Sequence, residues 1–332
     1  MSETLFKTIA LAIGDINGIG PEVTLKALTQ MPWPAAFRVA IVGPEAAVQF
    51  WQNYLRINLR LPRIANLDEW PDGAAVVILD RDCELPEVQA GKLSAAAGNV
   101  AGNALRQAIE LAAAGKVHAI VTAPASKHAL HLAGFHYPGQ TEFLAEGLGV
   151  SDFAMMLVAE NFRVALVTTH LPLRRVAGAI SPDLIVRKLR VLQRDLTTRF
   201  RIYQPRIAAT GLNPHAGEGG LLGDEEKTII APALQQARDE GIMAEGPFSA
   251  DALFGRCKEN RFDAYLAMYH DQGLIPLKMF GFGRAVNYTA GLPVIRTSPD
   301  HGTAFDIAGK NIAAPASMVE ALRLAAALLA SN

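Results

Sequence analysis

Short, almost wholly apolar segments alternate along this chain with longer segments of helical periodicity. Strands are predicted over residues 9–13, 38–42, 75–79, 119–122, 154–159, 163–167, 207–210 and 264–268. Helices are predicted over residues 22–29, 95–114, 141–148, 182–199, 225–240 and 317–330. Strands that lack polar alternation are buried on both faces, as in parallel sheets covered by helices. The order of the segments therefore predicts a layered α/β fold.

Size and charge restrict the kind of protein. Half of the 332 residues are apolar, which is enough for one large domain or two joined lobes, and no Gly/Ser linker separates parts of the chain. The net charge is -1, from 31 basic and 32 acidic residues. This balance argues against nucleic acid or a membrane surface as the main partner, so any anion must be bound by a few placed cations.

The cysteines and the apolar runs indicate the compartment. Cys83 and Cys257 are too few and too far apart in sequence for a disulfide framework, which fits a reducing cytoplasm. No stretch reaches about 18 uninterrupted apolar residues, so no membrane span is predicted. Within the long Ala-rich helix, Gly98 and Gly102 are expected to allow close packing of another helix.

Three histidines each follow a predicted strand at its carboxyl end: His170, His215 and His270. In open α/β sheets, ligands bind beyond the carboxyl ends of the strands. Neutral imidazole is the commonest protein ligand for Zn and related divalent ions, and three protein ligands with an open position describe a catalytic site. The sequence therefore predicts a metal site that acts as a Lewis acid on a carbinol carbon. The alternative, that each histidine only hydrogen-bonds its own loop, stays open.

Two cations and one glycine-rich loop add to this picture. Lys278 and Arg296 lie among apolar residues, in the segments "LIPLKMF" and "LPVIRTS". Burying an unpaired charge is costly, so the pair predicts a clamp for an anion such as phosphate, with ordinary surface solvation as the alternative. The loop "IGDINGIGPE" joins a strand to a helix, but its spacing is not G-x-G-x-x-G. No Rossmann fingerprint is present.

Longer strings carry a family resemblance. "TTHLPL", "GLNPHAGEGG", "MYHDQG", "GFGRAVNYTAGLP" and "RTSPDHGTA" resemble the 4-hydroxythreonine-4-phosphate dehydrogenases of vitamin B6 synthesis, the PdxA family. The resemblance runs from Ala12 to about Leu324. That family is similar in fold to isocitrate and isopropylmalate dehydrogenases. It implies that residues 1–332 form a single catalytic unit of two interleaved α/β lobes around a cleft. It also implies a homodimer with shared active sites, in which His270 reaches into the partner's site.

The resemblance also implies a reaction. A small phosphorylated hydroxy-amino acid, 4-phosphooxy-L-threonine, would be oxidised with NAD or NADP to 2-amino-3-oxo-4-(phosphooxy)butanoate. That product decarboxylates to 3-amino-2-oxopropyl phosphate in the synthesis of pyridoxine and pyridoxal 5'-phosphate. A divalent metal, Zn, Mg or Co, is implied on His170, His215 and His270.

Further site residues are expected on the same basis. Substrate contacts are implied for Gln140, Thr141, Lys278, Asn287 and Arg296. Candidates for the dinucleotide site are Gly211, Asn213, Asp300 and His301. The general base stays open between Asp251, Asp271 and a metal-bound hydroxide.

Some positions depart from the family's pattern, and other functions remain. Gln140 stands where many relatives have His, and Gln cannot carry a charge or shuttle a proton. Ala252 stands where the family usually has Thr. One alternative within the family is a D-threonate or D-erythronate 4-phosphate dehydrogenase. A second alternative is a non-catalytic protein that binds a metal and a phosphate ester.

Overall fold

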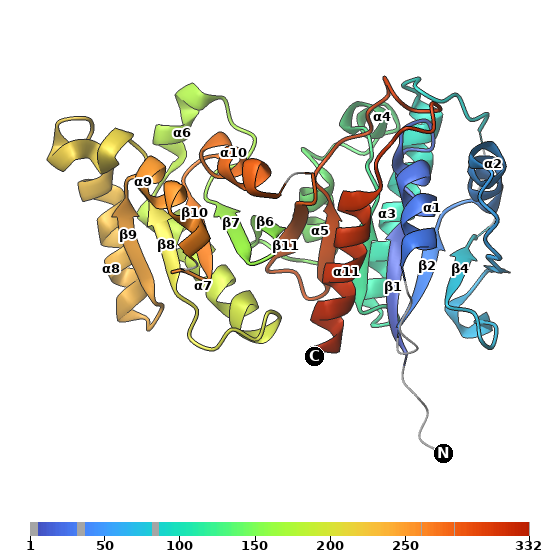
Figure 1. The fold of residues 1–332 in the computed structure, drawn as a ribbon, viewed down its shortest axis with the longest axis horizontal. Helices are drawn as coiled ribbons and strands as arrows, with labels where there is room; N and C mark the ends of the chain where they lie inside the picture. Colours follow the sequence, from blue (N-terminus) through green and yellow to red (C-terminus); the bar gives the residue numbers. More distant parts are fainter. Residues whose placement is uncertain (1–5, 32–36, 82–85, 260, 282, 332) are drawn as a thin grey trace, which may run out of the picture. The chain divides into compact units, whose positions relative to one another are not determined.

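The computed structural model describes residues 6–31, 37–81, 86–259, 261–281 and 283–331, and Figure 1 labels most of its elements. The chain forms two compact units. Unit 1 comprises Met1–Val150 and Leu292–Ala330, and unit 2 comprises Ser151–Gly291 with Ser331–Asn332. The chain therefore leaves unit 1 after residue 150 and returns to it after residue 291.

Unit 1 is built on parallel strands in the order β3-β4-β2-β1-β5-β12. Their bounds are β1 Lys7–Ala12, β2 Phe37–Val42, β3 Arg63–Ile64, β4 Val76–Leu79, β5 Ala119–Thr122 and β12 Ile295–Pro299. The helices are α1 Gly20–Gln30, α2 Glu45–Leu55, α3 Ala95–Ala113, α4 Lys127–Leu132, α5 Gln140–Gly147 and α11 Ala316–Ala330, with a 3-10 turn at Leu67–Glu69. Helix α3 packs on β1, β2 and β5, and α11 packs on β5 and β12.

Unit 2 mixes parallel and antiparallel strands in the order β11-β6-β7-β10-β8-β9. Their bounds are β6 Ala154–Ala159, β7 Phe162–Leu166, β8 Ile207–Thr210, β9 Ala244–Phe248, β10 Ala264–Ala267 and β11 Val286–Ala290. The helices are α6 Leu173–Ala179, α7 Pro182–Thr198, α8 Ala231–Asp239, α9 Ala250–Gly255 and α10 His270–Gly281, with short turns at Pro214–Gly220, Glu226–Ile230 and Cys257–Glu259. Helix α7 packs on β6 and β11, whereas α10 packs on β6, β7 and β10.

The α/β prediction is confirmed, with one correction to strand direction. β11 pairs with β6, and β6 with β7, in antiparallel fashion, whereas β7, β10, β8 and β9 run parallel. The two residues Glu160 and Asn161 join β6 to β7, and Glu160 has φ 54°. A turn this short can only connect antiparallel neighbours. The strands are nonetheless as buried as parallel ones, so the apolar pattern alone could not distinguish the two directions.

Local sequence explains where several helices begin and how they pack. The hydroxyls of Ser94, Ser126 and Ser181 accept hydrogen bonds from backbone N–H groups in the first turns of α3, α4 and α7. A Cβ at Gly98 would stand 2.0 Å from the Ala129 carbonyl, and one at Gly102 would stand 2.2 Å from the Phe135 ring. The predicted close approach to a neighbouring helix is confirmed for Gly98, which faces Ala129 of α4, whereas Gly102 faces the ring of Phe135, just beyond the end of α4.

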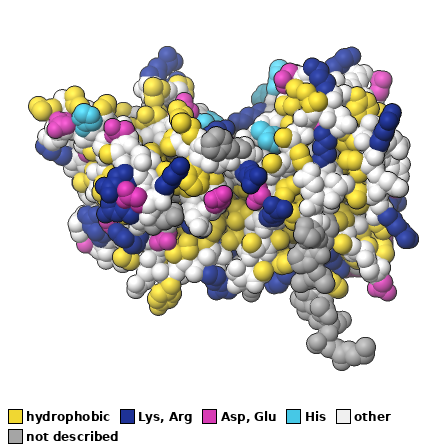
Figure 2. Space-filling model, in the orientation of Figure 1, with side chains coloured by type: hydrophobic (Ala, Val, Ile, Leu, Met, Phe, Trp, Pro, Cys, Tyr) yellow, Lys and Arg dark blue, Asp and Glu magenta, His cyan; other side chains and the backbone are white. Residues whose placement is uncertain are grey.

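The surface shows no single dominant charge on the face in Figure 2, where basic and acidic side chains are interspersed. This distribution matches the net charge of -1. Among the helices of the described ranges, none combines the length and the apolar character that a membrane crossing requires.

Candidate active site

The carboxyl ends of β7 and β10 lie side by side in unit 2, and each is followed by a predicted metal ligand. The backbone N–H and the hydroxyl of Thr168 both donate to the Met268 carbonyl, at 3.2 and 2.7 Å. His170 and His270 each follow this pair by two residues, so the register brings their rings together, with centroids 5.7 Å apart. Because a Zn–N bond is about 2.0–2.1 Å long, two imidazoles at this separation can share one ion.

Gln272, in the first turn of α10, ties the end of β10 to the end of β8. Its Oε1 accepts from the Met268 N–H at 2.7 Å and from the Thr210 hydroxyl at 2.8 Å. Its Nε2 donates to the Gly211 carbonyl at 2.7 Å. The Gly211 N–H in turn donates to the Phe248 carbonyl of β9 at 2.7 Å. The loop that carries His215 therefore begins at Gly211, whose backbone is held by these hydrogen bonds.

His215 lies on an unusual left-handed turn. The φ angles from His215 to Gly219 are 51°, 51°, 78°, 43° and 67°. A left-handed conformation costs a non-glycine residue roughly 1–2 kcal/mol, so His215, Ala216 and Glu218 are strained. Such strain persists only where surrounding contacts enforce it, and it concentrates at functional sites. The geometry supports a functional role for His215.

Glu226 supplies those enforcing contacts. Its buried carboxylate accepts hydrogen bonds from the N–H groups of Leu212 and Asn213, both at 2.7 Å, and from the Asn213 side chain at 3.0 Å. Burial opposes ionisation of Glu226, but these hydrogen bonds outweigh it and lower the pKa of the carboxyl. The loop is thus anchored to an ionised carboxylate.

Two of the histidines have a carboxylate on Nδ1. His270 Nδ1 lies 2.7 Å from the Asp271 carboxylate, and His215 Nδ1 lies 3.2 Å from the Glu218 carboxylate. A carboxylate that accepts the Nδ1–H leaves Nε2 unprotonated and able to bind a metal, the arrangement that metal-binding histidines commonly have. Asp271, predicted as a candidate base, therefore lies where it orients His270.

Asp251, the other predicted base, lies in the first turn of α9. The Ser249 hydroxyl donates to its carboxylate, and this bond, then the Ala252 N–H and the nearby His215, lower the pKa of Asp251. Asp251 is therefore ionised at neutral pH and close to His215.

The three predicted metal ligands do not form one cluster in a single chain. Among the residues that the structure describes, no three His, Cys, Asp or Glu side chains come together as a metal-binding group. One chain brings His170 and His270 together, and His215 does not join them in a metal-binding group.

In unit 1, Arg296 is the centre of a polar cluster. Its side chain is 2% exposed, and its Nη2 donates to the Thr122 hydroxyl at 2.8 Å and to the Gln140 Oε1 at 3.2 Å. Its Nη1 donates to the Thr141 hydroxyl at 3.3 Å. Burial lowers the pKa of Arg296 to about 10, opposed by the carboxylate of Glu142, so the guanidinium is charged at neutral pH. The structure brings three predicted substrate contacts together: Arg296, Gln140 and Thr141.

The other two predicted substrate contacts lie in unit 2. Asn287 is on β11, and its buried Oδ1 has no hydrogen-bond partner among the described residues. Lys278 is exposed, contrary to its expected apolar surroundings. Helix α10 was not predicted, and its periodicity turns Lys278 to the same face as Ile275 and Met279, which are 58% and 70% exposed.

The predicted dinucleotide residues divide into two groups. Both backbone groups of Gly211 are hydrogen-bonded, and the Asn213 amide nitrogen donates to Glu225 and Glu226, so these residues hold their own loop. His301 differs, because its Nε2 is buried without a partner among the described residues while Nδ1 lies 3.2 Å from the Gly302 carbonyl. The backbone N–H of its neighbour Asp300 donates to the Ser317 hydroxyl at 3.0 Å.

The loop that carries His301 meets the glycine-rich loop of residues 13–22. The Ile19 N–H donates to the Thr303 carbonyl at 3.0 Å, and a Cβ at Gly18 would stand 2.9 Å from the Thr303 side chain. The glycines of this loop therefore allow backbone contact with the His301 loop, in place of a Rossmann phosphate turn.

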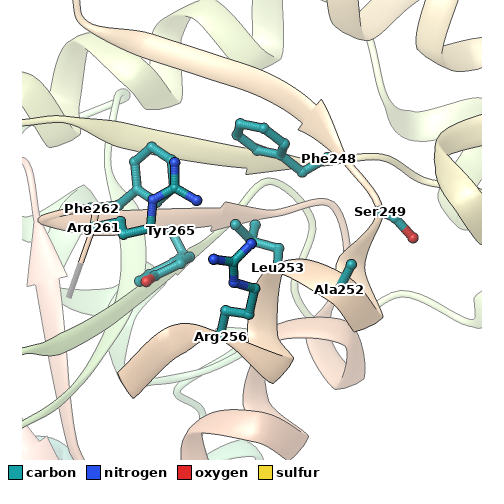
Figure 3. A pocket seen from close by; sticks show the side chains of 8 residues that line it. All are labelled: Phe248, Ser249, Ala252, Leu253, Arg256, Arg261, Phe262 and Tyr265. Carbon is teal, nitrogen blue, oxygen red and sulfur yellow. The ribbon is translucent and has the colours of Figure 1, made fainter. Parts of the chain in front are cut away.

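A cavity of about 230 Å³ lies along α9 (Figure 3). Its lining is Phe248, Ser249, Ala252, Leu253, Arg256, Arg261, Phe262 and Tyr265. The rings form apolar walls, and burial raises the pKa of the Tyr265 hydroxyl to about 12. Arg256 is held by two bonds to Glu259, at 2.8 and 3.0 Å. Ser249 and Ala252 place one end of this cavity beside Asp251.

Sequence reasoning missed Gln272 and Glu226, which position the histidine loops. Gln272 belongs to the polar run after β10, and that run was its only signal. Glu226 lies in "GDEEK" and reads as an ordinary acidic helix start. Its contact with Asn213 depends on the left-handed turn, and no local sequence pattern predicts that turn.

Comparisons with known proteins identify the family of this chain. Residues 37–325 match the family model described as "Pyridoxal phosphate biosynthetic protein PdxA". The 4-hydroxythreonine-4-phosphate dehydrogenase of Sulfurihydrogenibium sp. (strain YO3AOP1) is 41% identical over 317 residues, 96% of this chain and 97% of that protein. The D-threonate 4-phosphate dehydrogenase of Salmonella typhimurium is 42% identical over 322 residues, 96% of this chain and 98% of that protein.

A solved structure extends the likeness to the fold. The 4-hydroxythreonine-4-phosphate dehydrogenase of Klebsiella pneumoniae superposes with a TM-score of 0.86 at 41% identity, covering 98% of this chain and 99% of that one. The chain therefore belongs to the PdxA family of pyridoxal phosphate biosynthetic proteins.

Proposed function

We propose that this oxidoreductase uses a divalent metal and NAD or NADP to oxidise 4-phosphooxy-L-threonine. The carbinol carbon loses a hydride to the nicotinamide and its hydroxyl loses a proton to a base, giving 2-amino-3-oxo-4-(phosphooxy)butanoate. Loss of CO2 then gives 3-amino-2-oxopropyl phosphate for pyridoxine and pyridoxal 5'-phosphate synthesis, in the cytoplasm. Family membership supports the reaction class, and the observation that carries the site is the His170–His270 pair, 5.7 Å between centroids.

The metal would be held by imidazoles whose Nδ1 atoms face carboxylates. Such a donor set suits Zn or Co better than Mg, which prefers oxygen ligands. A divalent metal there would act as a Lewis acid on the substrate hydroxyl and on the ketone that follows. Asp271 and Glu218 would keep His270 and His215 in the metal-binding tautomer.

The third ligand would come from a second subunit. His170 and His270 lie together in one chain and His215 does not join them in a metal-binding group, so a shared site in a homodimer would complete the triad. This assignment pairs His270 with His170, whereas the family resemblance placed His270 across the boundary. The exposed Ile275 and Met279 on α10, which begins at His270, provide an apolar surface for such an interface.

The phosphate would bind at Arg296. The neutral acceptors Thr122, Thr141 and Gln140 orient the guanidinium. A planar fork recognises phosphate oxygens in bidentate fashion. Asn287, with its buried unpartnered Oδ1, and Lys278 would contact other polar groups of the substrate.

The remaining roles follow from the same geometry. Asp251, ionised beside His215, would accept the hydroxyl proton, since Asp271 is occupied with His270. His301, with its buried Nε2 acceptor, would contact the dinucleotide together with Asp300.

A direct comparison of substrates tests the proposal. Purified protein loaded with Zn or Co is given NAD or NADP with 4-phosphooxy-L-threonine, D-threonate 4-phosphate or D-erythronate 4-phosphate in parallel. We expect the highest kcat/KM with the first. A higher value with either sugar acid would favour the second candidate, which the Salmonella typhimurium relative's name supports. No reduced nicotinamide with any of them would indicate a non-catalytic binding protein.

A further inference from the structure

We propose that Lys127 is a further phosphate-binding residue of the Arg296 cluster, an inference that rests on the proposed function of that cluster. Lys127 is the first residue of α4, directly after the loop that follows β5. The end of β5 supplies the Thr122 hydroxyl to Arg296, and the loop supplies the Ala123 carbonyl to Gln140 at 3.2 Å. Lys127 therefore belongs to the segment from which the cluster is built.

The loop before Lys127 is held in place on several sides. The Asp15 N–H donates to the Pro124 carbonyl at 2.9 Å, and the buried Asp15 carboxylate interacts with the Ser126 backbone N–H. The Ser126 hydroxyl accepts from the Ala129 N–H at 3.2 Å and so caps α4. Gly14 has φ 75°, and a Cβ there would stand 2.4 Å from the Pro124 carbonyl oxygen. The backbone that carries Lys127 is fixed by these contacts, although its side chain is exposed.

The ammonium of Lys127 lies at the start of α5. A Cβ on Gly139, the residue before α5, would stand 3.8 Å from Lys127 Nζ and 2.9 Å from Glu142 Oε2. Gln140 and Thr141, which accept from Arg296, are the next residues of the chain. Lys127 thus points to the same end of α5 as Arg296.

The charges at this position favour an anion. Lys127 makes no hydrogen bond or ion pair within the described part of the chain. Arg296 and Lys127 contribute two positive charges and Glu142 one negative charge, so the cluster has a net positive charge. The first N–H groups of a helix add a favourable potential for phosphate. A phosphate dianion bound by the fork of Arg296 would gain a second, point-charge contact from Lys127.

The test compares Lys127→Met and Lys127→Arg with a matched control, Lys116→Met. Lys116 is an exposed lysine of unit 1 whose Nζ pairs with Asp68 at 3.1 Å, outside the cluster. Steady-state kinetics use 4-phosphooxy-L-threonine and its dephosphorylated form, and inhibition by inorganic phosphate is measured for each protein. Thermal unfolding checks that each variant is folded.

We expect Lys127→Met to raise KM for the phosphorylated substrate on the order of tenfold, the effect of one charge-assisted hydrogen bond, with little change in kcat. Inhibition by inorganic phosphate should weaken by a similar factor, Lys127→Arg should recover part of both, and Lys116→Met should match the wild type. The KM of the dephosphorylated substrate should not change.

Either of two results would overturn the inference. One is a folded Lys127→Met protein with wild-type KM and wild-type phosphate inhibition. The other is an equal rise in KM for both substrates, which would place Lys127 at the carboxylate. If the wild type oxidises no phosphorylated substrate, the proposed function fails by itself. Protection of each variant against thermal unfolding by inorganic phosphate would then still test Lys127.

Discussion

Single residues decide how this chain can hold an anion, and Arg296 is the clearest case. Its apolar neighbours in sequence predicted a buried cation, and the side chain is 2% exposed. The same reasoning wrongly indicated burial of Lys278. Its apolar neighbours Ile275 and Met279 lie on the exposed face of α10, a helix that was not predicted, and Lys278 lies on that face with them. Sequence surroundings therefore indicate burial only when the secondary structure is also known. Strand β12 turns Arg296 toward Thr122 of β5, and no local pattern could specify that partner.

Replacing Arg296 with Lys should weaken phosphate binding. One ammonium cannot reproduce the bidentate fork. KM for the phosphorylated substrate should therefore rise, by a factor that corresponds to a loss of about 1.5–3 kcal/mol in binding free energy. Arg323→Lys is the control, since Arg323 is exposed on α11 and pairs with Glu320. A wild-type enzyme that uses the dephosphorylated substrate equally well would refute the phosphate clamp.

Asp15 should make stability depend on pH. Burial raises the pKa of its carboxyl, opposed by hydrogen bonds from Asn17, Ser126 and Gly18. Because the pKa is raised on folding, the folded protein binds this proton more tightly than the unfolded chain does. The resulting stabilisation is fully present below the unfolded-state pKa, about 3.9, and is lost as the pH rises through the folded-state pKa. Asn cannot ionise, so Asp15→Asn should gain stability relative to the wild type as pH increases from 4 to 8. Urea unfolding at several pH values measures this, and a difference independent of pH would contradict it.

At the level of elements, regular periodicity was predictable and irregular backbone was not. The long helices α3 and α7 and the strands β5 and β8 lie where the pattern placed them. Helix α10 was missed because it begins in a polar run and contains Pro276. Strands β11 and β12 were missed because a Gly and a Pro separate two short segments. The left-handed turn at His215 depends on Glu226, a contact between elements, so sequence alone located the histidine but not its geometry.

Removing the Glu226 carboxylate should release that turn. Glu226→Ala leaves the N–H groups of Leu212 and Asn213 without their acceptor, and buried donors without partners cost about 1–3 kcal/mol of the free energy of unfolding. Metal affinity should fall as well, because His215 loses its support. Glu240→Ala, which removes an exposed partner of Arg190, serves as the control. Unchanged urea unfolding and unchanged metal affinity in Glu226→Ala would show that the left-handed turn does not need the Glu226 carboxylate.

At the scale of the whole molecule, the sequence strings identified the family, which the comparisons confirm, but not the assembly. A single chain contains a pair of neighbouring histidines, His170 and His270, and the third, His215, does not join them in a metal-binding group. Completion of the metal site by a partner subunit stays a prediction, because interfaces leave no periodic signal in sequence. The exposed Ile275 and Met279 on α10 suggest one surface where a partner would pack.

Mixing inactive subunits tests whether the two subunits of a dimer share each active site. If His170 and His270 serve one chain's site and His215 serves the partner's, mixing His170→Ala with His215→Ala subunits creates one intact site in each mixed dimer. Half the dimers are mixed and half their sites are intact, so activity should approach about one quarter of the wild type. Mixing His170→Ala with His270→Ala should restore none. The reverse outcome would place His270 across the boundary, and no recovery in either mixture after verified subunit exchange would rule out shared sites.

The most direct test of the account is the metal content of histidine variants, measured with turnover on the same samples. His170→Ala, His215→Ala and His270→Ala should each lose bound Zn or Co together with most of the activity. His136→Ala, whose ring in unit 1 contacts only that of His131 among the rings described, should keep both. A His215→Ala protein with full metal content and full turnover would contradict the assignment of the three strand-end histidines as the catalytic metal site.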